Sequence, residues 1–202
     1  IPLNRDTAER IYEEANSKLK DMSVRSLLNS FKVEFIATTD DPLDDLLYHK
    51  KYDSINVTPT FRPDRLFEFE DSYLTRLGNV SGVVIKSLKD LLKSLAIRLD
   101  YFVEKGCRMA DHGMDTFPDN YASENQAEVL FEKHSSLSEK ERDSLKGYLL
   151  VWLSKEYAKR DITVQFHFAV TRNVNKSSFM LSGPDSGFDV ISEAPSVKNV
   201  IG

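Results

Sequence analysis

The chain has 202 residues, of which 41% are hydrophobic, 29% charged and 10% aromatic. This composition is typical of a soluble globular protein and excludes a disordered chain. Asp and Glu (32) outnumber Lys and Arg (27) and give a net charge of −5, so nucleic acid is not an expected partner. No apolar run approaches the roughly 18 residues that a membrane span needs, so no membrane partner is expected either.

The cysteine content and the start of the chain add two expectations. Cys107 is the only cysteine, which excludes an internal disulfide and favours a reducing, cytoplasmic setting. The chain opens on Ile1 without a start methionine or a signal-peptide pattern, which predicts a processed chain or a fragment. No shift in composition marks a domain boundary, so we expect a single domain over 1–202.

Helical and strand-like patterns alternate along the chain. Apolar residues at helical spacing predict helices, and short apolar runs predict strands. In chain order the predicted elements are helices 6–20 and 23–30, strand 33–37, helix 41–51, strand 55–61, helices 70–77 and 87–105, strand 107–110, helices 124–134 and 138–160, and strand 162–170, with 190–191 as a candidate start of a further element.

This alternation implies a parallel sheet built from βαβ units. Two architectures fit, a doubly wound sheet and a (β/α)8 barrel. No Gly-x-Gly-x-x-Gly motif follows any predicted strand, and the chain holds only 8 Gly, so a dinucleotide or phosphate-loop site is not expected.

Polar residues collect at the end of each predicted strand. They are 38–41 after the first, 62–65 after the second, Asp111, His112 and Asp115 after the third, and Gln165, His167, Arg172, Asn173 and Asn175 within and after the fourth. Because the carboxyl ends of parallel strands share one edge of a sheet, we expect these side chains to meet there. The pattern predicts a polar site for a small, anionic molecule.

Two of these residues also have a structural interpretation. Asp41 lies at the start of the predicted helix 41–51, where a carboxylate stabilises any helix. Arg62 can be a surface turn residue, but its place directly after strand 55–61 favours a role in the site.

The four histidines divide into two pairs. His112 is flanked by two aspartates, which suits an oriented catalytic base or metal ligand, or else a core histidine bonded to one of them. His167 alternates with two phenylalanines and so points away from them, toward the lumen if the sheet closes into a barrel. A strand histidine of this kind is equally often a satisfied core residue. His49 and His134 lie among charged residues of predicted helices, and we interpret both as solvated.

At these clusters the chain resembles a known family, the uronate (glucuronate) isomerases of the amidohydrolase superfamily. The matching stretches occur in the family's order and at similar spacing. They are Thr-Thr-Asp-Asp-Pro at 38–42 with Asp44, Leu46 and His49, Pro-Thr-Phe-Arg-Pro-Asp at 59–64, Arg-Leu-Asp-Tyr-Phe at 98–102, Gly-Cys at 106–107, Asp-His-Gly-Met-Asp at 111–115, Gln-Phe-His at 165–167, Arg-Asn-Val-Asn at 172–175 and Gly-Pro-Asp-Ser-Gly-Phe-Asp at 183–189. One departure is Ala169, where the family pattern has Gly.

The resemblance implies an α/β fold, a distorted (β/α)8 (TIM-like) barrel. We expect a partial barrel here, of about four parallel strands with flanking helices, as the central segment of a larger enzyme. The resemblance also implies interconversion of D-glucuronate with D-fructuronate and of D-galacturonate with D-tagaturonate. Enzymes of the family carry a divalent metal, often zinc, held by a His-x-His pair and an Asp. The chain contains no His-x-His and lacks the family's later Thr-Asp-Ser-Arg-Ser-Phe motif, so we expect no metal ligand in it and no activity from it alone.

Moving a hydrogen between C1 and C2 of a sugar acid requires a base, an acid and charge stabilisation at the enediolate oxygens. Arg62 and Arg172 suit the substrate carboxylate, because a guanidinium matches it in shape and charge. His167 is the candidate for proton transfer or for polarising an oxygen. The candidate residues are Arg62, Arg172 and Asp41 for substrate binding, and His167, Asp111 and His112 for catalysis, the last two as orienting groups.

Two alternative functions stay open at this point. A metal-dependent hydrolase on the same barrel would need more metal-binding side chains at strand ends than we find. The other alternative is a non-catalytic fragment that binds a sugar acid. The expected partner is a small sugar acid, and the open edges of a partial barrel predict self-association or attachment to the remainder of the parent chain.

Overall fold

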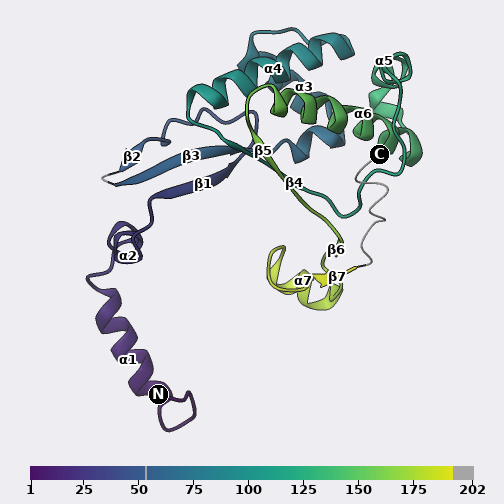
Figure 1. Cartoon of the computed structure of the whole chain (residues 1–202). Helices are drawn as coiled ribbons and strands as arrows, with labels where there is room; N and C mark the ends of the chain where they lie inside the picture. The colour runs from purple at the N-terminus through teal and green to yellow at the C-terminus, as the bar shows by residue number, and fades with distance from the viewer. Residues whose placement is uncertain (53, 193–202) are drawn as a thin grey trace. The chain divides into compact units, whose positions relative to one another are not determined.

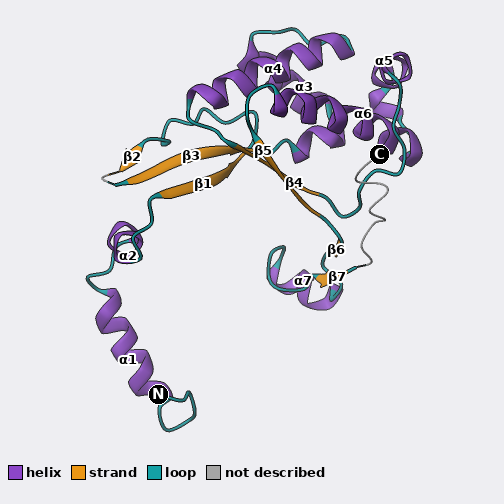
Figure 2. Cartoon of the chain, viewed as in Figure 1, coloured by secondary structure: helices purple, strands orange, loops and turns teal. Residues whose placement is uncertain are grey.

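The computed structural model describes residues 1–52 and 54–192, and Figures 1 and 2 show its helices and strands. In chain order they are α1 (Ala8–Leu19), α2 (Val24–Ser30), β1 (Phe35–Asp40), β2 (Lys51–Tyr52), β3 (Ile55–Phe61), the 3-10 helix η1 (Asp64–Glu68), α3 (Asp71–Ser81), α4 (Leu88–Glu104), β4 (Met109–Gly113), α5 (Glu124–Glu132), the 3-10 helix η2 (His134–Ser136), α6 (Glu139–Ala158), β5 (Thr163–His167), β6 (Val170–Thr171), α7 (Lys176–Ser182) and β7 (Val190–Ile191).

The chain divides into two compact units. The first, 1–36 with 50–57, holds α1, α2, β2 and the beginnings of β1 and β3. The second, 37–49 with 58–202, holds the remaining elements and every residue of the candidate site. A division into compact units does not show which parts of the chain fold independently. The single domain expected over 1–202 therefore stays a prediction. No helix of the described residues is long and apolar enough to cross a membrane.

The main sheet has the strand order β1-β3-β4-β5, and β2 is joined to the side of β3. β3 pairs with β4 and β4 with β5, both in parallel. In the second pair Asp111 lies opposite Gln165 and Gly113 opposite His167. Helices α3, α4 and α6 all lie on one side of this sheet (Figure 1). The predicted α/β class, with a parallel sheet and flanking helices, is therefore confirmed.

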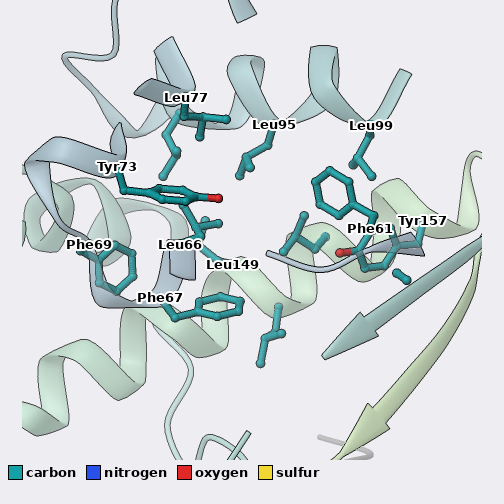
Figure 3. Close-up of a cluster of buried hydrophobic side chains, with 14 of the residues drawn as sticks. Phe61, Leu66, Phe67, Phe69, Tyr73, Leu77, Leu95, Leu99, Leu149 and Tyr157 are labelled. Atoms are coloured by element: carbon teal, nitrogen blue, oxygen red, sulfur yellow. The ribbon is translucent and has the colours of Figure 1, made fainter. Parts of the chain in front are cut away.

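The hydrophobic core of the second unit lies between the sheet and these helices (Figure 3). Phe61 at the end of β3 is fully buried, and its ring packs edge to face on Phe102 of α4, with centroids 5.0 Å apart. The apolar stripe predicted for 87–105 is confirmed, since Leu91, Leu95 and Leu99 are fully buried. This packing fixes the position of β3, which leads directly into Arg62.

The helix predicted over 41–51 is wrong. Side chains there bond the backbone locally, since Asp44 accepts from the Asp41 N–H (2.8 Å) and Asp41 accepts from the Leu43 N–H (2.9 Å). Leu46 has a φ of 54°, a left-handed conformation that breaks a helix. The segment is a series of turns that leads into β2.

Three predicted strands shift in position. β1 continues to Asp40 and β4 to Gly113, so polar residues expected in loops belong to strands, while β5 already ends at His167. The polar residues at these positions led us to predict loops, but a polar side chain with a buried partner fits a strand as well as an apolar one. α7 was not predicted, and β7 coincides with the candidate element at 190–191.

Candidate active site

Four polar side chains meet at the carboxyl ends of β3, β4 and β5. The guanidinium of Arg62 donates from Nε to Asp64 Oδ2 (2.7 Å) and from Nη1 to Asp111 Oδ2 (3.2 Å). The other carboxylate oxygen of Asp111 lies 2.7 Å from His167 Nε2. This contact lacks hydrogen-bond alignment, so Asp111 Oδ1 is a buried oxygen with no hydrogen-bond donor among the described residues. The predicted meeting of Arg62, Asp111 and His167 is confirmed.

The strand register explains why these side chains meet. In β4, Asp111 and Gly113 point to the face opposite the helices, while His112 between them points into the core. Gly113 pairs with His167 of β5, which places the imidazole beside Asp111. The Arg62 N–H donates to the carbonyl of Asp40 (2.9 Å), which anchors the residue after β3.

The cluster is half-buried and rich in negative charge. Side-chain exposure is 15% for Asp111 and 28% for Arg62, but 41% for His167, which is the most open of the group. Burial lowers the pKa of Arg62, yet the hydrogen bond and charge of Asp64 and the charge of Asp111 outweigh it and hold that pKa above its usual value. Two carboxylates, those of Asp64 and Asp111, therefore face one guanidinium and one imidazole.

His112 does not join this cluster. It is fully buried against the helices, with Nε2 3.0 Å from the hydroxyl of Tyr157 on α6 and its ring stacked on Phe166. Burial, with the nearby positive charges of Lys146, Arg62 and His167, lowers the pKa of His112 from 6.5 to about 3. His112 is thus a neutral core histidine, bonded to a tyrosine rather than to one of its flanking aspartates.

Asp41 and Arg172 also lie apart from the cluster. Asp41 accepts a hydrogen bond from the hydroxyl of Tyr73 (3.0 Å), and burial, the largest influence, raises its pKa. Arg172 donates to Asp189 (3.1 Å) and lies 3.5 Å from Asp115. Asp41 is thus bonded to α3 and Arg172 to acidic residues outside the cluster, and their predicted roles in substrate binding stay predictions.

His49 was interpreted as solvated, and the structure shows otherwise. Its side chain is 10% exposed, with Nε2 2.7 Å from Thr38 Oγ1 and 3.3 Å from Asp40 Oδ1. Asp40 also accepts from the Thr60 N–H, so this group ties the end of β1 to β3. His134 is 20% exposed and contacts Asp71 at 2.7 Å, so it too is only partly solvated.

Two residues of the cluster, Asp64 and Gly113, were given no role in the site from the sequence, although Asp64 belongs to the polar stretch 62–65 that was expected to meet there. Asp64 begins η1, and a polar residue in an Arg-Pro-Asp turn after a strand was a usable signal. A glycine at a strand end also signals close approach by another group. Among the described residues no group of three or more His, Cys, Asp or Glu is arranged to hold a metal ion.

Comparison with models of protein families identifies the family of this chain. The family model described as glucuronate isomerase matches residues 1–201. The chain belongs to the glucuronate isomerase family. Its curated relatives in this family include the uronate isomerases of Pectobacterium carotovorum (37% identical) and Caldanaerobacter subterraneus (36% identical). Each match covers 96% of this chain and 44% of the relative, so the chain spans less than half of the length of these glucuronate isomerase relatives.

Solved structures of the family share its fold. The crystal structure of uronate isomerase from Thermotoga maritima matches with a TM-score of 0.89 and 29% identity, over 100% of this chain and 47% of that one. Glucuronate isomerase from Caulobacter crescentus matches with a TM-score of 0.78 and 25% identity, over 88% of this chain and 39% of that one. The chain is a part of the TIM-like barrel of the glucuronate isomerase family, as the resemblance implied.

Proposed function

We propose that this chain is part of a uronate isomerase that interconverts D-glucuronate with D-fructuronate, and D-galacturonate with D-tagaturonate. The observation that carries the proposal is the convergence of Arg62, Asp111 and His167 at the carboxyl ends of three parallel strands, in a chain of this family. Family membership favours this activity over the hydrolase considered from the sequence. A cytoplasmic location is part of the same proposal, because a single cysteine, Cys107, favours a reducing setting.

Arg62 and His167 supply complementary parts of the chemistry. Nη2 of Arg62 makes no hydrogen bond to a described residue and is the donor left for a substrate oxygen or carboxylate. The imidazole of His167 lies 2.7 Å from Asp111 and suits proton transfer at the substrate oxygen that becomes the enediolate oxygen.

The divalent metal expected for the whole enzyme does not fit the described residues of this chain. Asp111 and His167, which contact each other, offer two possible metal ligands. Within the described ranges no third His, Cys, Asp or Glu side chain joins them to hold a metal ion. The metal, with zinc as the expected ion, therefore belongs to the proposal for the whole enzyme, with its ligands elsewhere in that protein. No step assigned to Arg62 or His167 depends on it.

The chain by itself is expected to show no uronate isomerase activity, whereas the full-length protein that contains it turns over glucuronate. The reason is that one cluster at three strand ends supplies only part of the required acid, base and charge stabilisation. The measurement is ketose formation from glucuronate by both proteins, purified in parallel with a blank preparation. Turnover by the 202-residue chain above the blank would contradict this expectation.

We also expect the isolated chain to self-associate, or to be recovered together with the remainder of its parent chain. Leu181 of α7 is 90% exposed and Ile191 of β7 is 92% exposed. Burying such a side chain against another surface would contribute about 1.5–3 kcal/mol of free energy, which favours association. Light scattering on the purified chain measures the outcome. A monodisperse monomer of 23.1 kDa, with a single band on a denaturing gel, would show that these side chains need no cover.

A further inference from the structure

We propose that Asp64 and Gly113 are positioning residues for Arg62, one by holding its guanidinium and the other by leaving space for it. This inference rests on the proposed function, because its consequence is measured as uronate binding. Neither residue needs to touch the substrate. Both would act by fixing the direction in which Nη2 of the Arg62 guanidinium points.

Asp64 joins the turn after β3 to the end of β4. Its Oδ2 accepts from Arg62 Nε at 2.7 Å and from the backbone N–H of Gly113 at 3.1 Å. Oδ1 receives a longer bond from the same N–H, at 3.3 Å. The carboxylate is 26% exposed, so this charge-assisted bridge is largely shielded from water. The guanidinium is thus tied to the backbone of a neighbouring strand through one carboxylate.

Gly113 provides the space in which the guanidinium lies. A Cβ at this position would be 2.3 Å from Arg62 Nη2, 2.8 Å from His167 Cε1 and 3.1 Å from Asp64 Oδ2. The first two distances are under 3.0 Å, which real Cβ atoms essentially never show, so the ends of the Arg62 and His167 side chains would have to move. The backbone of Gly113 is in a strand and is not in the left-handed region, so alanine fits its backbone without strain. The requirement for glycine is therefore one of space for the site side chains.

Together these contacts leave Arg62 little freedom. Nε and Nη1 are held by two carboxylates, and Gly113 lies against Nη2. A guanidinium is planar, so fixing two of its nitrogens fixes the third. A binding group held in this way loses less freedom when the substrate arrives, and small displacements of such a group are costly. Loosening either contact should therefore weaken uronate binding more than it slows turnover.

The test uses the full-length enzyme with Asp64→Asn and Gly113→Ala, and the readouts are KM and kcat for glucuronate. We expect each variant to raise KM about tenfold with a smaller change in kcat, because a displaced binding group costs affinity first. Asp64→Glu, which keeps the charge, should recover part of the loss. In an Arg62→Lys background either change should raise KM less than about twofold further, because coupled residues are not additive.

Two matched controls separate positioning from stability. Gly82→Ala introduces strain, because Gly82 has a φ of 70°, but its Cβ meets nothing within 4 Å. Asp161→Asn removes an exposed carboxylate at a position with a φ of 53°, which asparagine tolerates well. Both controls should leave KM unchanged even where the unfolding midpoint falls. Unchanged KM in Asp64→Asn and Gly113→Ala, or full additivity with Arg62→Lys, would overturn the proposal.

A crystal structure of the Gly113→Ala enzyme keeps this inference separate from the proposed function. We expect the Arg62 guanidinium to be displaced by about 1 Å or more, with the strands unchanged, because the Cβ takes its place. An undisplaced guanidinium would refute the positioning role of Gly113, whatever the activity. If the unmodified full-length enzyme turned over no uronate, the proposed function would fail, and this structure would still decide the positioning role.

Discussion

Arg62→Lys in the full-length enzyme is expected to raise KM for glucuronate roughly ten- to a hundredfold, with a smaller effect on kcat. A charge-assisted contact of this kind contributes about 1.5–3 kcal/mol. A lysine ammonium cannot contact Asp64 and Asp111 and still offer a third nitrogen in the same plane. Steady-state kinetics with varied glucuronate measure the change.

The neighbouring Arg65 provides the control for this substitution. Arg65 is exposed, and its guanidinium lies over the ring of Tyr73, 5.5 Å from the centroid, an arrangement that a lysine can reproduce. Arg65→Lys should therefore leave both kinetic constants unchanged. Equal kinetics for Arg62→Lys and Arg65→Lys would show that Arg62 is only a turn residue.

The second large effect concerns acid stability. The pKa of His112 lies near 3 in the folded chain, while a histidine in the unfolded chain titrates near 6.5. Between these values the unfolded state binds a proton that the folded state does not. The contribution of His112 is therefore fully present above about pH 6.5 and is lost as the pH falls toward 3, by up to about 1.4 kcal/mol per pH unit.

Urea unfolding at a series of pH values measures this contribution. His112→Gln removes the titrating group, so its free energy of unfolding should fall less steeply than that of the unsubstituted chain below pH 6.5. Tyr157→Phe is the matched control, because it removes the hydroxyl bonded to His112 but keeps the buried imidazole. It should lower stability and keep the steep pH dependence. Parallel curves for the unsubstituted chain and His112→Gln would contradict the burial of a neutral His112.

Local patterns in the sequence were enough to predict the elements that carry the core. Strand 55–61 was predicted with the bounds of β3, and 87–105 differs from α4 by one residue at each end. In both cases apolar residues of the pattern pack into the core, and a capping or helix- or strand-breaking residue marks the end of the element. Segment 41–51 failed because Asp41 and Asp44 bond the backbone as turn residues, a competition that periodicity does not detect.

The site was predictable as far as strand ends could be located. Arg62 and His167 follow or end strands, and both belong to the cluster. His112 and Asp111 are neighbours in sequence but face opposite sides of β4, and only the strand register reveals which of them meets Arg62. Asp64 and Gly113 carry local signals, an Arg-Pro-Asp turn and a glycine at a strand end, but the side chains that they contact are set by the strand register.

Ala169 shows how a departure in sequence can carry structural information. The resemblance implies a Gly at this position, and Ala169 adopts a φ of 67° in the left-handed region that favours glycine. The backbone after His167 therefore adopts a conformation that glycine takes more readily than alanine.

The position of a uronate bound to the full-length enzyme tests the central claim most directly. The claim is that Arg62 and His167 belong to the substrate site. A crystal structure with bound glucuronate or fructuronate should place substrate oxygens within hydrogen-bond distance, about 2.7–3.2 Å, of Arg62 and of His167 Nε2. A well-ordered uronate that contacts neither side chain would contradict the account.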